Sequence, residues 1–172
     1  MPGRNKKAAP RIAASDAPTL DRFLTHRITV LGHLLTRTAQ RWHEKNSGLS
    51  LTAWRMLAIL AGFGPMTQTQ IGEVIFIDLA RISRVKTSLV AKGLVSEIPD
   101  PADNRRTILA PTKSGAALYR KLLPDALKRQ EDLYEQFSDA DVAVFNRVLD
   151  GMIEQISQED ARQTGGSGSR AA

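Results

Sequence analysis

Residues 67–113 read TQTQIGEVIFIDLARISRVKTSLVAKGLVSEIPDPADNRRTILAPTK, and this stretch decides the fold. Thr67 and Gln70 have the T-x-x-Q spacing of a capping box, which predicts the start of a short helix. After a tight turn, Asp78 has the position of an N-cap for a second helix over 78–91. The stretch therefore begins with two short helices joined by a turn.

Two strands are expected after the second helix. Residues 94–98 and 107–110 alternate between apolar and polar side chains, as half-buried strands do. The loop between them, PDPADNRR, is rich in residues that favour turns. Asp103 is spaced to hold one of the two following arginines, which leaves either Arg105 or Arg106 at the tip. Helix, turn, helix and hairpin in this order predict a winged helix-turn-helix. The alternative for the hairpin is that its arginines only pair with the local aspartates.

The second helix has two different faces. Ile82, Val85 and Leu89 recur at helical spacing and must face the core. The opposite face is small, hydroxylated and cationic, and it consists of Ala80, Arg81, Ser83, Arg84, Thr87 and Ser88, with Lys86 on its flank. Small residues allow a helix to enter the major groove, which is about 12 Å wide, and arginine can bond guanine or phosphate. Taken alone, this face is equally well explained as a DNA-binding surface or as an ordinary solvated helix face. The hairpin that follows favours DNA binding.

The flanking segments predict a dimerisation arm. Leu20 to His43 has apolar residues at spacings of three and four, and two further apolar helices are expected between 114 and 160, with a kink or break at Pro124. Helices with so much apolar surface need a partner, and an intertwined dimer supplies it; a monomeric helical bundle is the alternative. The predicted fold class is mainly α with a small β-hairpin wing, flanked by N- and C-terminal dimerisation helices.

The sequence divides into five expected parts. These are a disordered basic arm (1–17), an N-terminal helix of the dimerisation region (18–48), the winged helix-turn-helix (49–113), C-terminal dimerisation helices (114–160) and a flexible tail (161–172). In the basic arm, Lys6, Lys7 and Arg11 either contact phosphates or are simply solvated.

Composition narrows the class of protein. The 172 residues carry a formal net charge of +6, which favours a polyanionic partner. The absence of cysteine excludes disulfides, thiolate metal sites and thiol redox switches. No apolar run approaches the roughly 20 residues of a membrane span, and no signal peptide is recognisable, so a cytoplasmic protein without a membrane partner is expected. No nucleophile–base pair, phosphate loop or metal cluster is present, which predicts a protein that is not an enzyme and has no cofactor or metal.

Several motifs resemble the multiple antibiotic resistance regulator (MarR) family of bacterial transcription factors. They are LTAWRML from Leu51, GPMTQ from Gly64, I-x-R-x-K-x-x-L-V-A-K-G-L-V from Ile82, DPADNRR from Asp100 and PTKSG from Pro111. The resemblance extends from about Leu20 to Ile156 and is densest over 51–115. Two positions depart from the family: Phe76 stands where many members have glycine, and Lys86 where many have an apolar residue.

The resemblance implies a homodimeric transcription regulator that binds a pseudo-palindromic operator as a ligand-responsive repressor. It makes 78–91 the recognition helix and pairs Asp103 with Arg105, which enters the minor groove. The predicted DNA contacts are Ala80, Arg81, Ser83, Arg84, Lys86, Thr87, Asp103, Arg105 and Arg106. It also implies a small organic effector, aromatic or anionic. His33 and Trp54 are the only candidate residues for binding it that the sequence provides. The alternative is a winged-helix module that binds proteins and has no specific DNA site.

Overall fold

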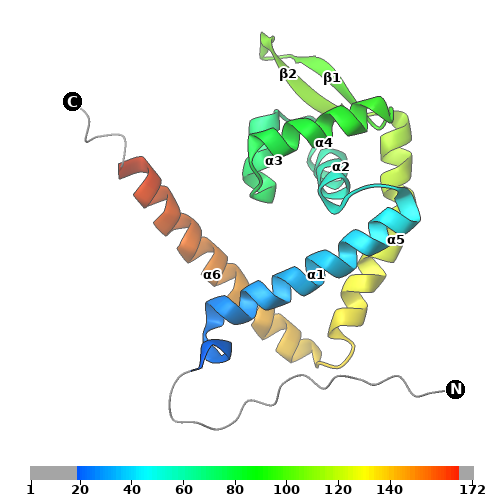
Figure 1. The fold of residues 1–172 in the computed structure, drawn as a ribbon. Helices are drawn as coiled ribbons and strands as arrows, with labels where there is room; N and C mark the ends of the chain where they lie inside the picture. The colour runs from blue at the N-terminus through cyan, green and yellow to red at the C-terminus, as the bar shows by residue number, and fades with distance from the viewer. Residues whose placement is uncertain (1–18, 167–172) are drawn as a thin grey trace, which may run out of the picture. The chain divides into compact units, whose positions relative to one another are not determined.

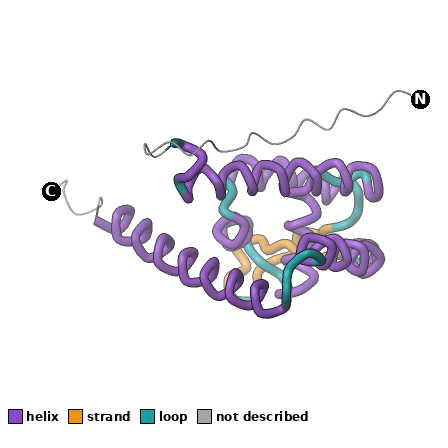
Figure 2. The backbone as a smooth tube through the Cα atoms, turned by 90° about the horizontal axis from the view of Figure 1, so that it is seen from below, coloured by secondary structure: helices purple, strands orange, loops and turns teal. Residues whose placement is uncertain are grey.

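The computed structural model describes residues 19–166, without the side chains of 104, 105 and 164–166. The predicted basic arm at 1–17 lies outside these residues. The described chain consists of helices and a two-stranded antiparallel hairpin (Figure 2), which confirms the predicted fold class of a mainly α protein with a small β-hairpin.

The elements follow the predicted order (Figure 1). They are η1 (Leu20–Arg22), α1 (Leu24–Ser47), α2 (Leu51–Phe63), α3 (Gln68–Ile75), α4 (Leu79–Ala91), β1 (Val95–Asp100), β2 (Asp103–Pro111), α5 (Lys113–Tyr134) and α6 (Asp139–Gly166). The chain forms two compact units that divide between Tyr119 and Arg120, within α5. The first unit holds α1 to α4, the hairpin and the start of α5.

Side-chain caps fix the starts of the central helices. In α3, Gln70 N donates to Thr67 Oγ1 at 3.2 Å and Thr67 N donates to Gln70 Oε1 at 2.9 Å, which confirms the predicted capping box. In α4, Arg81 N donates to Asp78 Oδ1 at 2.8 Å, as the sequence predicts. Each cap satisfies backbone N–H groups that have no partner within the helix.

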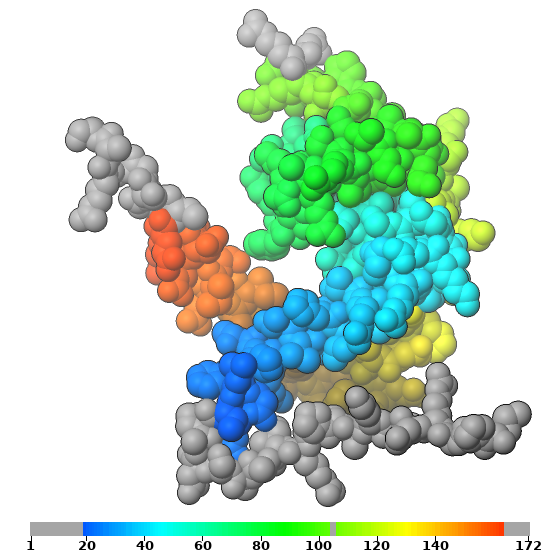
Figure 3. Space-filling model, in the orientation of Figure 1, coloured from blue at the N-terminus to red at the C-terminus, as the bar shows by residue number. Residues whose placement is uncertain are grey.

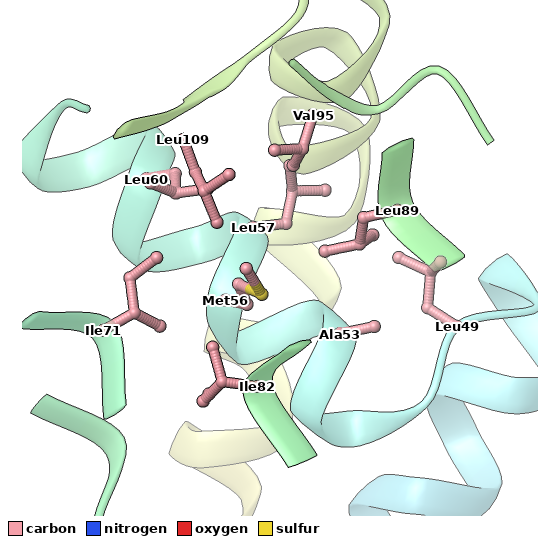
Figure 4. Close-up of a cluster of buried hydrophobic side chains, with 10 residues drawn as sticks. All are labelled: Leu49, Ala53, Met56, Leu57, Leu60, Ile71, Ile82, Leu89, Val95 and Leu109. Atoms are coloured by element: carbon pink, nitrogen blue, oxygen red, sulfur yellow. The ribbon is translucent and has the colours of Figure 1, made fainter. Parts of the chain in front are cut away.

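The core of the first unit is built around α2. Its Met56 and Leu57 are fully buried, and side chains from α3, α4 and both strands surround them (Figure 4). From α4 come Ile82 and Leu89, also fully buried, while Val85 packs against the cluster. Each such side chain contributes about 1.5–3 kcal/mol by leaving water. The predicted inward stripe of α4 is therefore confirmed, and the opposite face of α4 is its outer one.

The turn between α3 and α4 contains an unusual residue. Phe76 has φ of 53° and ψ of 51°, a left-handed conformation that glycine adopts without strain, and its side chain is 82% exposed. It is the only described residue other than glycine with a positive φ. Gly72 is needed nearby, because a Cβ there would lie 3.0 Å from the carbonyl oxygen of Ile77. The turn is therefore compact and keeps its shape at some cost in strain.

The first long helix starts later than the sequence predicts and ends as expected. A 3-10 turn over Leu20–Arg22 precedes α1, which begins at Leu24. Gly48, with φ of 64°, ends the helix in the left-handed conformation. Among the 24 residues of α1 only His43 is buried.

Two expectations for the C-terminal helices need correction. Of the kink or break expected at Pro124, the break is absent, because α5 runs continuously from Lys113 to Tyr134, and the kink stays a prediction. A single missing N–H removes one backbone bond, and the other bonds of the helix remain. α6 extends to Gly166, into the predicted tail, because the sequence up to Gln163 is rich in good helix formers; the rest of that tail, 167–172, lies outside the described residues. None of the helices in the described chain is long and apolar enough to cross a membrane.

Candidate nucleic-acid interface

The outer face of α4 is open to solvent. Five of the predicted DNA contacts, Ala80, Arg81, Ser83, Arg84 and Thr87, are exposed on this helix. Figure 3 shows α4 at the surface of the first unit, with the hairpin beside it. The structure therefore brings these five residues together on one surface, as a helix period requires once the inward stripe is fixed.

The two arginines of this face keep their charge available. Within residues 19–166, neither Arg81 nor Arg84 forms an ion pair with an acidic side chain. Guanidinium groups have five donors and match phosphate or the guanine edge in bidentate geometry. The surface can therefore bind a polyanion without first breaking internal ion pairs.

Lys86 has a different environment from these arginines. Its Nζ lies 2.7 Å from Glu97 Oε1 on β1, and its side chain is only 18% exposed. The sequence placed Lys86 among the DNA contacts, on the flank of the outer face. The structure directs its ammonium to a strand of the hairpin, because Lys86 lies on the side of α4 that packs against β1.

The hairpin is anchored at its base and carries charge toward its tip. Leu109 of β2 is buried and exchanges two backbone hydrogen bonds with Met66, at 2.8 and 3.1 Å. Near the tip, Arg106 Nε lies 3.3 Å from Asp103 Oδ2. The carboxylate of Asp103 thus reaches Arg106, next to the irregular register after Pro99, while the pairing of Asp103 with Arg105 that the resemblance implies stays a prediction. The side chain of Arg105 lies outside the described residues.

The two residues predicted for an effector are not brought together. Trp54 is buried and stacks on His43, with ring centroids 4.9 Å apart, and on Tyr119 at 5.5 Å. His33 is exposed on α1, ten positions before His43, which corresponds to about 15 Å along a helix. The buried histidine of α1 is therefore His43 and not His33. No local pattern of residues signals this stack, because its three rings come from α1, α2 and α5.

A pocket that sequence reasoning missed adjoins α4. It is an open hollow of about 460 Å³ between α4 and the start of α2, lined by residues 48–50 among others. Arg81, Arg84 and Lys92 line one wall, and no acidic residue is among the lining residues described. Leu49 and Val85 also line the pocket, so its lining combines apolar and cationic side chains. No spacing within α4 could have revealed it, because the start of α2 forms the opposite side of the pocket.

Metal binding has no support in the described residues, where no cluster of three or more histidine, aspartate or glutamate side chains could hold an ion. The fold and the cationic outer face of α4 define a winged helix-turn-helix DNA-binding protein.

Comparisons with known proteins identify the family. A family model described as "MarR family" matches residues 47–106. The transcriptional repressor NicR of Pseudomonas putida is 31% identical over 133 residues, which cover 74% of this chain and 81% of NicR. The chain therefore belongs to the MarR family, whose members are transcription regulators rather than enzymes, and it is a DNA-binding transcription regulator.

Solved structures share the fold. A MarR/EmrR family regulator from Acinetobacter sp. ADP1 has a TM-score of 0.75 at 23% identity, covering 82% of this chain and 99% of that one. BpsR of Bordetella bronchiseptica, whose DNA binding is regulated by 6-hydroxynicotinic acid, has a TM-score of 0.71 at 20% identity, covering 79% and 96%. MepR of Staphylococcus aureus in complex with DNA has a TM-score of 0.68 at 19% identity, covering 77% and 96%.

Proposed function

We propose that the chain is a homodimeric, ligand-responsive repressor that binds a pseudo-palindromic operator. The observation that carries this proposal is the outer face of α4, where Arg81 and Arg84 are exposed and have no acidic partner in the described residues. The solved complex of MepR with DNA supports a nucleic-acid partner for this fold.

Each part of the interface has an expected role. Arg81, Ser83 and Arg84 contact bases or adjacent phosphates in the major groove, while Ala80 and Thr87 allow the helix to approach. At the wing, Arg105 enters the minor groove, whose negative potential attracts a guanidinium group. Asp103, whose carboxylate lies 3.3 Å from Arg106 Nε, orients the arginines at the tip, and Arg105 is the one we expect in the minor groove.

Exposed apolar side chains support a dimer, in each unit considered separately. On α1 the large exposed residues are Leu24, Ile28, Val30, Leu31, Leu34 and Leu35. In the second unit they are Leu127, Leu133, Phe137, Val144, Phe145, Val148, Ile153 and Ile156. Monomeric proteins rarely leave such long apolar stripes in water, and a second copy supplies matching surface. Two copies related by a two-fold axis would place two α4 helices in half-sites about one helical turn apart.

The pocket beside α4 supports an organic anion as the effector. The cationic side chains of its lining suit a carboxylate, and the apolar ones suit a ring. A ligand there would occupy Arg81 and Arg84, which DNA also needs, and would compete with the operator directly. The regulation of BpsR by 6-hydroxynicotinic acid makes this compound a reasonable first probe.

Selection of binding sites from random double-stranded DNA tests the main proposal. The full-length protein should enrich a two-fold symmetric sequence. Absence of any enriched site would favour the alternative, a winged-helix module that binds proteins.

Titration of the selected complex with 6-hydroxynicotinic acid tests the effector site. Release should be saturable and should weaken in Lys92→Ala, because this residue lines the pocket at the end of α4. His33→Ala is the matched control, since His33 is exposed on α1 and should leave the response unchanged. A response that depends on His33 and not on Lys92 would move the effector away from the pocket.

A further inference from the structure

An ion pair joins the recognition helix α4 to the first strand of the wing. Lys86 Nζ and Glu97 Oε1 are 2.7 Å apart, close enough for a charge-assisted hydrogen bond. The side chain of Lys86 is 18% exposed and that of Glu97 is 42% exposed. Partial burial limits screening by water and salt, so the pair is better placed than a fully exposed one to hold its geometry.

This pair divides the cations of α4 into two groups. Arg81 and Arg84 lie on the outer face and have no acidic partner in the described chain, whereas Lys86 is paired with a carboxylate. A lysine that only increased affinity for phosphate would have no need of a carboxylate so close. The distribution of partners therefore suggests different roles for the two groups.

The location of Glu97 explains what the pair can control. Glu97 lies on β1 opposite Leu109 of β2, and Leu109 is fixed to Met66 by two backbone hydrogen bonds. The hairpin is thus held to the core by Val95 of β1 and Leu109 of β2, and β1 is also joined to α4 through Glu97. An isolated two-stranded hairpin is only marginally stable in water, so these attachments determine its direction.

We propose that Lys86 and Glu97 are positioning residues that fix the angle between α4 and the wing, so that both reach DNA at the same time. The proposal rests on the proposed DNA-binding function. Fixing the angle in the free protein removes an ordering cost on binding, which is how preorganisation increases affinity.

The variant Glu97→Gln separates positioning from simple electrostatics by the sign of its effect. It removes a negative charge close to the DNA-binding surface and releases the ammonium of Lys86. Electrostatics alone then predicts tighter binding to a polyanion. Positioning predicts weaker binding, by up to about fivefold, which is the upper end for a partly exposed ion pair.

The experiment measures affinity for the selected operator by fluorescence anisotropy at fixed salt, with the full-length protein. Glu97→Gln and Lys86→Met should both bind more weakly, and the charge-reversed double variant Lys86→Glu with Glu97→Lys should recover most of the loss. Asp132→Asn is the matched control: its partner is Lys128, at 2.8 Å on α5, and it removes the same charge outside the first unit. It should change affinity by less than about twofold.

Footprinting adds a measurement that a loss of stability alone would not change. At saturating protein, Glu97→Gln should keep the major-groove protection of α4 and lose the minor-groove protection of the wing. Tighter binding by Glu97→Gln would overturn the positioning role. The same holds if the charge-reversed variant recovers no affinity although its unfolding temperature equals that of the wild type. A wild-type protein that binds no DNA would instead contradict the proposed function itself.

Discussion

The helices α1 and α2 are neighbours in the first unit and yet differ in burial. α2 has 13 residues, of which eight are buried, whereas α1 has 24 residues and buries only His43. The winged helix-turn-helix thus completes its core within one chain, with α2 at the centre. α1 instead leaves an apolar stripe exposed. The difference indicates that a single chain is sufficient for the reading surface, and it supports the proposal that the arm pairs with a second copy.

Removing a core side chain should give the largest effect. Leu57→Ala leaves a cavity beside a fully buried cluster and should lower the free energy of unfolding by about 2–5 kcal/mol. Urea denaturation followed by circular dichroism measures this. The loss should be the same at all protein concentrations, and a concentration-dependent loss would place Leu57 in the dimer contact instead.

A charge on the exposed stripe of α1 should separate the copies. Leu34→Glu would bury an unpaired carboxylate in the dimer, at a cost of about 3 kcal/mol or more, which is over a hundredfold in the dimer dissociation constant. Sedimentation velocity measures the oligomeric state. Arg37→Glu adds the same group at a position of α1 that is already polar and should stay dimeric. A dimeric Leu34→Glu protein would show that α1 is not the contact.

On the reading surface, Arg84→Ala should weaken operator binding by about 1–3 kcal/mol. The physical reason is loss of a bidentate contact from an exposed guanidinium that has no acidic partner in the described residues. Competition binding on the selected operator and on a variant with one base pair changed measures affinity and specificity together. An equal loss on both DNAs would show that Arg84 contacts phosphate rather than a base.

At the tip of the wing, Arg105→Ala should weaken binding and reduce the slope of log K against log salt by roughly 1. Arg106→Ala is the control, because Arg106 lies 3.3 Å from the carboxylate of Asp103 and should change the slope less. Anisotropy titrations over a series of salt concentrations give both slopes. Unchanged affinity and slope in Arg105→Ala would mean that the wing does not touch DNA.

The smallest effect is expected at the turn. Phe76→Gly should stabilise the protein by about 1 kcal/mol, since φ of 53° strains phenylalanine but not glycine and the phenyl ring is exposed. Gly48→Ala, at φ of 64°, should destabilise by a similar amount. Thermal unfolding compares the two. A destabilised Phe76→Gly protein would indicate that the ring makes a contact that stabilises the fold.

Features that depend on neighbouring residues could be predicted from the sequence. The caps at Thr67 and Asp78 follow from residues three positions apart, and the inward stripe of α4 follows from its own period. The family motifs could be recognised for the same reason, because each lies within a short run of residues.

Features that depend on distant residues could not be predicted. Lys86 and Glu97 are joined across two elements, and His43 meets Trp54 only because the chain turns after α1. The spacing of Asp103 left two arginines open as its partner, and its contact with Arg106 lies beside an irregular register that the sequence does not reveal. The cationic pocket needs the start of α2 opposite α4, which no spacing in α4 alone reveals.

The most direct test of the central claim is a hydroxyl-radical footprint of the full-length protein on its selected operator. If each chain completes its own reading surface and two chains pair through the apolar arm, the footprint should show two protected half-sites. These half-sites should be related by two-fold symmetry and centred about one helical turn apart. A single protected half-site at saturating protein would contradict it.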